Sequence, residues 1–71
     1  MSKFRKGSEV RWQWGDGSGT GKVAESFTAR VTRQINGSEI TRNGSDDCPA
    51  YLIEQEDGGR VLKLHSELEQ A

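Results

Sequence analysis

The chain has 71 residues, ten Lys and Arg against eleven Asp and Glu, and a formal net charge of −1. This length allows one small domain, and the single cysteine excludes an internal disulfide. Thirteen Leu, Ile, Val and Phe residues make a thin set of core candidates, to which two Trp and one Tyr add buried area. Disordered chains tend to carry a high net charge, so we expect a folded domain of marginal stability.

The charges are unevenly distributed along the chain. Residues 1–44 carry eight Lys and Arg and four Asp and Glu, whereas residues 45–71 carry two and seven. Strands from both halves interleave in a barrel, so we expect a mixed solvated surface. We expect residues 1–7 to be a flexible basic segment and residues 8–71 to form the domain. No apolar run follows the N-terminus, which predicts a cytoplasmic protein with no signal peptide and no membrane span.

The first predicted strand covers residues 10–14, where Val10, Trp12 and Trp14 alternate with polar residues. The glycine-rich segment 15–21 is predicted to be a flexible connection.

Residues 22–34 give two conflicting signals. Their apolar residues recur every four positions, as in a helix, but their β-branched residues favour strands. We therefore expect either one long bent strand or two strands joined near residues 26–28.

Two turn signals organise the second half of the chain. Asn36-Gly37 and Asp57-Gly58-Gly59 supply the positive φ angles of tight hairpin turns. The strands expected beside them cover residues 39–42, 50–56 and 60–65, with a loop at 43–49. Ser66 to Glu69 has the pattern of a capping box, which predicts a short helical turn.

These elements predict an all-β fold, a small five-stranded SH3-like barrel with a short C-terminal helical turn. The residues expected to be largely buried are Val10, Trp12, Val23, Leu52, Ile53, Val61 and Leu62.

The glycine-rich segment approaches three ligand-binding motifs without completing any of them. Asp16 stands where a P-loop has its first glycine. A dinucleotide fingerprint needs a helix within a βαβ unit, which the chain is too short to form. Phe27 stands where a calcium loop needs a bidentate glutamate. A turn between strands explains all three patterns.

No catalytic or metal-binding set emerges from the titratable residues. Cys48 and His65 occur once each, whereas metal sites need three or four ligands. The carboxylates lie in predicted turns and on open strand faces. We therefore expect no enzyme activity, no metal and no cofactor, and we interpret Cys48 as an incidental thiol.

Aromatic residues are the best candidates for a ligand site. Trp14 adjoins the glycine-rich segment, and Tyr51 begins a strand beside a polar loop. Aromatic side chains at a barrel rim can cage a cation, stack on a base or bind a peptide. We predict a site of Trp14 and Tyr51, with Trp12 as a further member that is more typical of the core. Burial in the core or packing on a loop is the alternative for each ring.

Six short segments together form a family-like pattern. They are Lys6 to Trp14, Gly21-Lys-Val23, Arg42-Asn43, Pro49-Ala-Tyr-Leu-Ile53, Asp57-Gly58 and Lys63 to Leu68. This pattern resembles the hypervirulence-associated Tudor-like domain family over nearly the whole chain. The resemblance implies a Tudor/SH3-like barrel. Many Tudor domains bind methylated side chains in an aromatic cage, for which at most Trp12, Trp14 and Tyr51 are available here.

The sequence thus predicts a binding module. We expect a protein or peptide segment as its ligand, bound at an aromatic barrel rim that Arg11 and Arg42 border. These arginines would favour an acidic or phosphate-bearing partner. Nucleic acid is the alternative, and a strong dependence of binding on salt would distinguish it. The sequence does not determine the oligomeric state.

Overall fold

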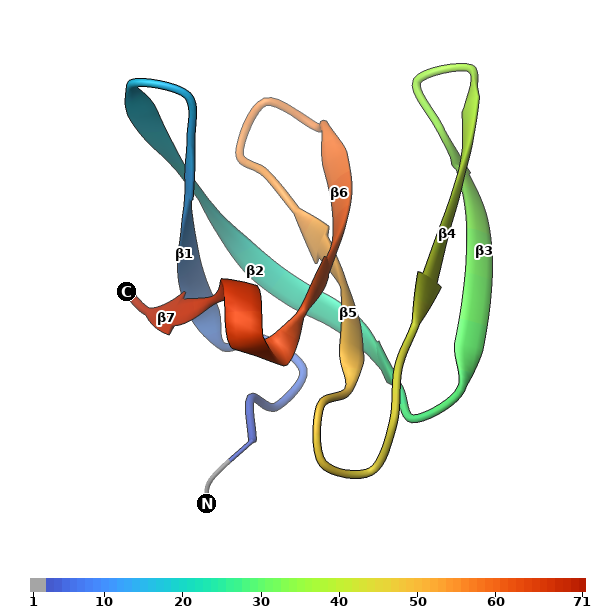
Figure 1. Ribbon diagram of the computed structural model, residues 1–71. Coiled ribbons are helices and arrows are strands. Elements are labelled where there is room, and N and C mark those ends of the chain that lie inside the picture. Colours follow the sequence, from blue (N-terminus) through green and yellow to red (C-terminus); the bar gives the residue numbers. More distant parts are fainter. Residues whose placement is uncertain (1–2) are drawn as a thin grey trace.

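The computed structural model describes residues 3–71 and, within them, every side chain except that of Trp14. The regular secondary structure of the described residues consists of strands and one short 3-10 helix (Figure 1). In chain order these are β1 (Glu9–Trp14), β2 (Gly17–Phe27), β3 (Arg30–Ile35), β4 (Ser38–Asn43), β5 (Ala50–Glu54), β6 (Arg60–Leu64), η1 (His65–Glu67) and β7 (Glu69–Gln70). The predicted all-β class is confirmed.

The strands form an antiparallel five-stranded sheet in the order β6-β5-β2-β1-β7 and a separate β3–β4 hairpin. β2 pairs first with β1 and, from Lys22 onward, with β5. The pairing with β5 contains a bulge between Val23 and Glu25, and bulges sharpen the twist of a strand. Within the described residues β4 and β6 do not pair, so the sheet is not a closed barrel.

Two expectations for the first half of the chain meet different outcomes. The chain bends at Thr28 and Ala29 between β2 and β3, so the alternative of two strands is confirmed. The flexible connection at 15–21 is wrong, because only Gly15 and Asp16 form a turn and β2 begins at Gly17. The hydrogen bonds between two strands of a hairpin join backbone groups alone, so glycines can form them. Side chains of the opposite strand, such as the Trp12 ring over Gly19, then shield the backbone.

Both predicted turns are present. Asn36 (φ 52°) and Gly37 (φ 80°) connect β3 to β4, as a primed turn requires. Gly58 (φ 88°) lies in the connection between β5 and β6, where Gln55 donates its N–H to the Gly59 carbonyl at 2.7 Å.

The cap of the C-terminal helical turn lies two residues earlier than the predicted capping box, with Leu64 and not Ser66 at the N-cap position. Glu67, and not Glu69, accepts the N–H that caps it, from Leu64 at 2.9 Å. Leu68 directly follows η1, and its side chain is buried in the core, so the chain lies against the sheet again at this residue. Glu69 then pairs with Arg11 of β1 as part of β7.

Two hydrophobic clusters lie on opposite faces of β5. Tyr51 and Ile53 belong to the first cluster, and Ala50 and Leu52 to the second, because successive side chains of a strand point to opposite faces. Six of the seven predicted core residues are buried, whereas Val61 is half-buried. Four further hydrophobic residues are buried in the core that the sequence pattern did not indicate, which are Val31, Ala50, Tyr51 and Leu68. No helix in the described part of the chain is long and apolar enough to cross a membrane.

Candidate functional site

Tyr51, one of the predicted ligand-binding residues, is fully buried and does not lie at an open rim. Its hydroxyl accepts the N–H of Phe4 at 3.3 Å and shares a hydrogen bond with Nδ1 of His65 at 3.1 Å. The rings of Phe4 and His65 lie 5.6 and 5.9 Å from its own, so they cover it. No pattern in the sequence indicated that Phe4, in a segment expected to be flexible, contacts this ring. The flexibility of residues 1–7 stays a prediction.

The environment of Tyr51 favours its neutral form. Burial raises the pKa of the phenol, and the hydrogen bond from the Phe4 N–H opposes part of that rise. Because the phenol oxygen accepts from Phe4, its own proton is free to be donated to His65. Tyr51 therefore links the N-terminal segment to the helical turn η1.

Trp12 is also buried, with 4% of its surface exposed. Its indole lies against Gly19, the residue directly opposite on β2. A Cβ at Gly19 would stand 2.6 Å from the ring, so only glycine leaves room for this packing. Trp12 thus belongs to the core, which is the role its sequence context favours. The prediction for Trp14 stays a prediction, because its side chain lies outside the described ones.

The two arginines predicted to border the site lie on strands of different sheets. Arg11 on β1 pairs with Glu69 at 3.0 Å, and both side chains are half exposed or more. Arg42 on β4 pairs with Glu67. Nε of Arg42 is buried and has no hydrogen-bond partner among the described groups, so this guanidinium is only partly satisfied. Of the predicted residues whose side chains the structure describes, Arg42 lines a hollow.

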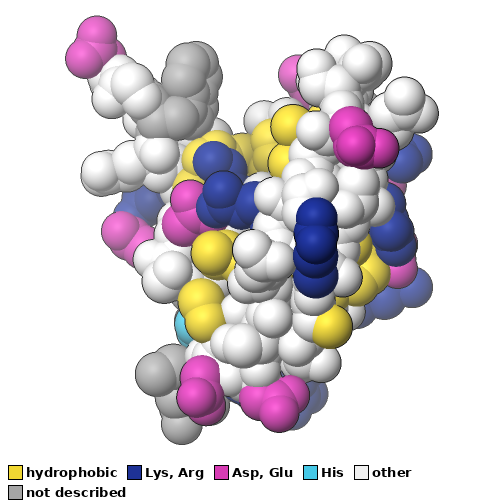
Figure 2. All heavy atoms as spheres, turned by 45° about the vertical axis from the view of Figure 1, so that its right-hand side comes forward, with side chains coloured by type: hydrophobic (Ala, Val, Ile, Leu, Met, Phe, Trp, Pro, Cys, Tyr) yellow, Lys and Arg dark blue, Asp and Glu magenta, His cyan; other side chains and the backbone are white. Residues whose placement is uncertain are grey.

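That hollow, the basic groove, lies between the β3–β4 hairpin and β6 and has a volume of about 410 Å³. Its apolar lining consists of Ile35, Ile40, Val61 and Leu62, and its basic lining of Arg42, Arg60 and Lys63. On the face that Figure 2 shows, hydrophobic and basic side chains lie next to one another. A second hollow of about 250 Å³ shares Ile35 and Arg60 and continues toward the hairpin turns.

The basic groove runs between two strand edges. β6 pairs with β5 alone and β4 with β3 alone within the described residues. β4 and β6 nevertheless lie beside each other, with their turns pointing to the same end of the molecule (Figure 1). Unpaired edges of this kind are templates for an additional strand.

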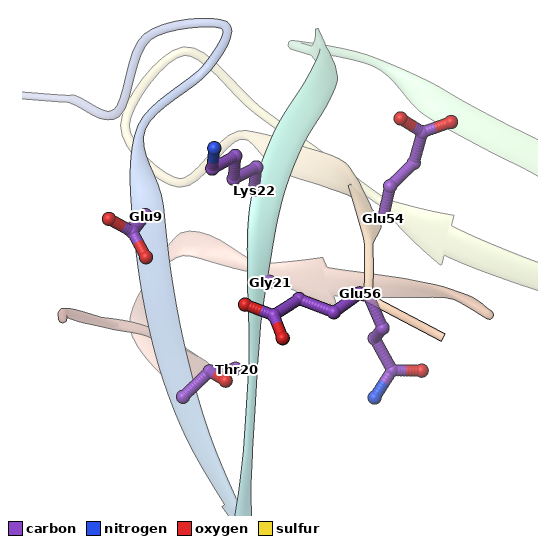
Figure 3. A pocket seen from close by; sticks show the side chains of 7 residues that line it. Glu9, Thr20, Gly21, Lys22, Glu54 and Glu56 are labelled. Atoms are coloured by element: carbon purple, nitrogen blue, oxygen red, sulfur yellow. The ribbon is translucent and has the colours of Figure 1, made fainter. Parts of the chain in front are cut away.

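A third hollow, on the other side of the β5–β6 hairpin, is lined mainly by acidic side chains. This acidic groove, of about 270 Å³, is lined by Glu9, Lys22, Glu54 and Glu56 together with Thr20, Gly21 and Gln55 (Figure 3). Lys22 lies in register between Glu9 of β1 and Glu54 of β5. Three carboxylate side chains and one ammonium group therefore line this groove.

Cys48 is half-buried in the loop before β5. Hydrogen bonds with the hydroxyl and the backbone of Ser66 lower the pKa of its thiol, and the Sγ to Oγ distance is 3.6 Å. In the described part of the chain, no three His, Cys, Asp or Glu residues are grouped as metal ligands would be.

The basic groove could not be predicted from the sequence, because its lining comes from separate hairpins. Ile35 and Ile40 flank the Asn36-Gly37 turn, and Val61 and Lys63 lie on either side of the buried Leu62 on β6. The one available signal was that Arg60 and Lys63 are the only basic residues after Asn43 and lie close together.

Comparison with protein families matches residues 7–68 to the family described as hypervirulence associated proteins TUDOR domain. Comparisons with curated proteins and with solved structures gave no match.

Proposed function

The chain belongs to the family of hypervirulence-associated TUDOR domains, and on this premise we propose that it binds an extended segment of a partner protein in the basic groove. Tudor-like domains are typically small, non-catalytic binding modules for proteins or nucleic acids. The choice between these partners therefore depends on the chemistry of the groove.

The observation that carries the proposal is the pair of unpaired strand edges on either side of a partly apolar groove. Ile35, Ile40 and Val61 are each half-buried, so part of their apolar surface stays in contact with water. An extended segment can cover these side chains and pair with the free backbone groups at the same time. The proposed site keeps Arg42 from the predicted set and adds Arg60 and Lys63.

The lining of the groove favours protein over nucleic acid. Of its three basic side chains, Arg42 is already paired with the carboxylate of Glu67, which leaves fewer free cations for phosphates. No described aromatic side chain lines it, whereas single-stranded nucleic acid is bound largely by stacking of bases on aromatic rings.

Selection from a random peptide library followed by NMR titration tests the proposal. We expect selected peptides to shift the backbone amides of β4 and β6. Ile40→Ser should weaken their binding at least tenfold, because it removes apolar lining. Thr20→Ser in the acidic groove is the matched control and should leave binding unchanged. Peptides that shift other surfaces, or tight binding of a single-stranded oligonucleotide with no selected peptide, would contradict the proposal.

A further inference from the structure

Within the proposed function, on which this inference rests, we propose that the bound segment is acidic and adds a strand to the free edge of β6. Its expected pattern has two carboxylates three residues apart with two apolar residues between them. The segment would add a sixth strand to the five-stranded sheet, next to Arg60–Leu64.

The backbone of β6 supports this mode of binding. Its five residues pair one to one with β5 from Ala50↔Leu64 to Glu54↔Arg60, so one edge is fully used. The other edge has no strand partner among the described residues. Five paired residues span about 17 Å at the usual rise of a strand, which sets the length of the segment.

The side chains of β6 set the pattern. In a strand pair, residues directly opposite each other are in contact, and opposite charges there are favourable. The basic side chains Arg60 and Lys63 are separated by the apolar pair Val61 and Leu62. A segment with the complementary order places a carboxylate opposite each basic residue and an apolar side chain opposite each apolar one. This order reads the same for a parallel and an antiparallel segment.

Charge complementarity extends across the groove to β4. Arg60 is 59% exposed and lies 4.0 Å from Glu54, a distance at which an exposed ion pair contributes little. It is therefore free to pair with a carboxylate of the segment. Arg42 faces the same groove with its Nε unpartnered among the described groups, so a further acceptor would complete its hydrogen bonding.

The β3–β4 hairpin is attached in a way that leaves room for a strand. Besides its side-chain packing on the second cluster, it is anchored at one end, where the chain continues into β2 and β5 and where Arg42 pairs with Glu67. Its turn at Asn36 and Gly37 lies at the opposite end and pairs with no other strand. Tilting about the anchored end widens the groove without breaking any strand pair.

Three synthetic peptides test the inference. The first has the core Glu-Ile-Val-Glu, the second replaces both Glu by Lys, and the third keeps the Glu core but carries N-methyl groups on alternate backbone nitrogens. By fluorescence anisotropy we expect the first to bind, the second to bind at least tenfold more weakly, and the third to lose binding because it cannot complete a strand ladder. The variant R60E/K63E should bind the Lys peptide more tightly than the Glu peptide. If this double variant unfolds, K63E alone should reduce the preference for the Glu peptide. K22E in the acidic groove is the control and should keep the original preference.

Equal binding of the Glu and Lys peptides, or undiminished binding of the N-methylated peptide, would overturn this inference. If either peptide still shifted the amides of β4 and β6, the proposed function would survive that result. If selected peptides bound only elsewhere, the proposed function itself would fail. If a single-stranded oligonucleotide displaced the Glu peptide at a lower concentration than unlabelled Glu peptide does, both this inference and the proposed function would be overturned.

Discussion

The two faces of β5 are both buried, but they are covered in different ways. The face of Tyr51 and Ile53 is covered by the two ends of the chain, through Phe4 on one side and Leu68 on the other. Backbone hydrogen bonds fix this cover, since β7 pairs with β1 and Ala71 donates its N–H to the Glu9 carbonyl at 3.1 Å. The face of Ala50 and Leu52 is covered by the β3–β4 hairpin, which packs on it through side chains.

This difference explains where the molecule can bind. A cover fixed by strand pairing uses the backbone edges that it meets, whereas a cover made by side-chain packing leaves those edges free. The first face therefore acts as the core of the domain. The second face shares its border with the basic groove, where the edge of β6 is unpaired.

The largest expected contrast between the two clusters comes from truncating one apolar side chain that packs in each. Trp12→Ala should lower the free energy of unfolding by about 3–5 kcal/mol, because Trp12 is 4% exposed and packed in the first cluster. That loss is comparable with the whole stability of a domain of this size. Ile40→Ala, which truncates a half-buried side chain beside the groove, should cost only about 1–2 kcal/mol. Urea unfolding followed by circular dichroism measures both, and equal costs would show that the two covers are energetically alike.

A smaller effect tests how tightly the first face is packed. Gly19→Ala would place a methyl group 2.6 Å from the Trp12 ring, and overpacking of this kind costs about 1–3 kcal/mol. Gly17→Ala is the matched control on the same strand, since a Cβ there meets nothing within 4 Å. We expect a lower melting temperature and altered Trp fluorescence for the first variant only. Similar melting temperatures for both would mean that the Trp12 ring can move aside.

The smallest effect appears only at alkaline pH. Because the pKa of Tyr51 is raised in the folded state, its contribution to stability is fully present below the unfolded value of about 10. That contribution is lost as the pH rises through the folded pKa. Tyr51 is the only tyrosine, so tyrosinate absorbance reports on it directly.

We expect the folded chain to titrate above pH 10 and the guanidinium-unfolded chain to titrate near it. Tyr51→Phe should remove this part of the alkaline loss of stability. A folded chain that titrates at or below pH 10 would show that the first face admits water.

Local sequence determined the strands and turns of this protein. Val10 and Trp12 alternate with polar residues and form β1, and Asn36-Gly37 adopts the positive φ angles that the hairpin turn needs. These features depend on neighbours within a few residues, so a pattern in the sequence reports them. The same reasoning placed most of the core, because alternation in a strand assigns side chains to faces.

Contacts between distant residues decided the rest. Tyr51 became core and not rim because Phe4 and His65, 47 and 14 residues away in sequence, cover it. The glycine segment became strand because Trp12 covers Gly19 from the opposite strand. The basic groove exists because β4 and β6 lie side by side without pairing. Each of these outcomes depends on how the strands pack against one another in three dimensions, which the spacing of residues along one strand does not encode.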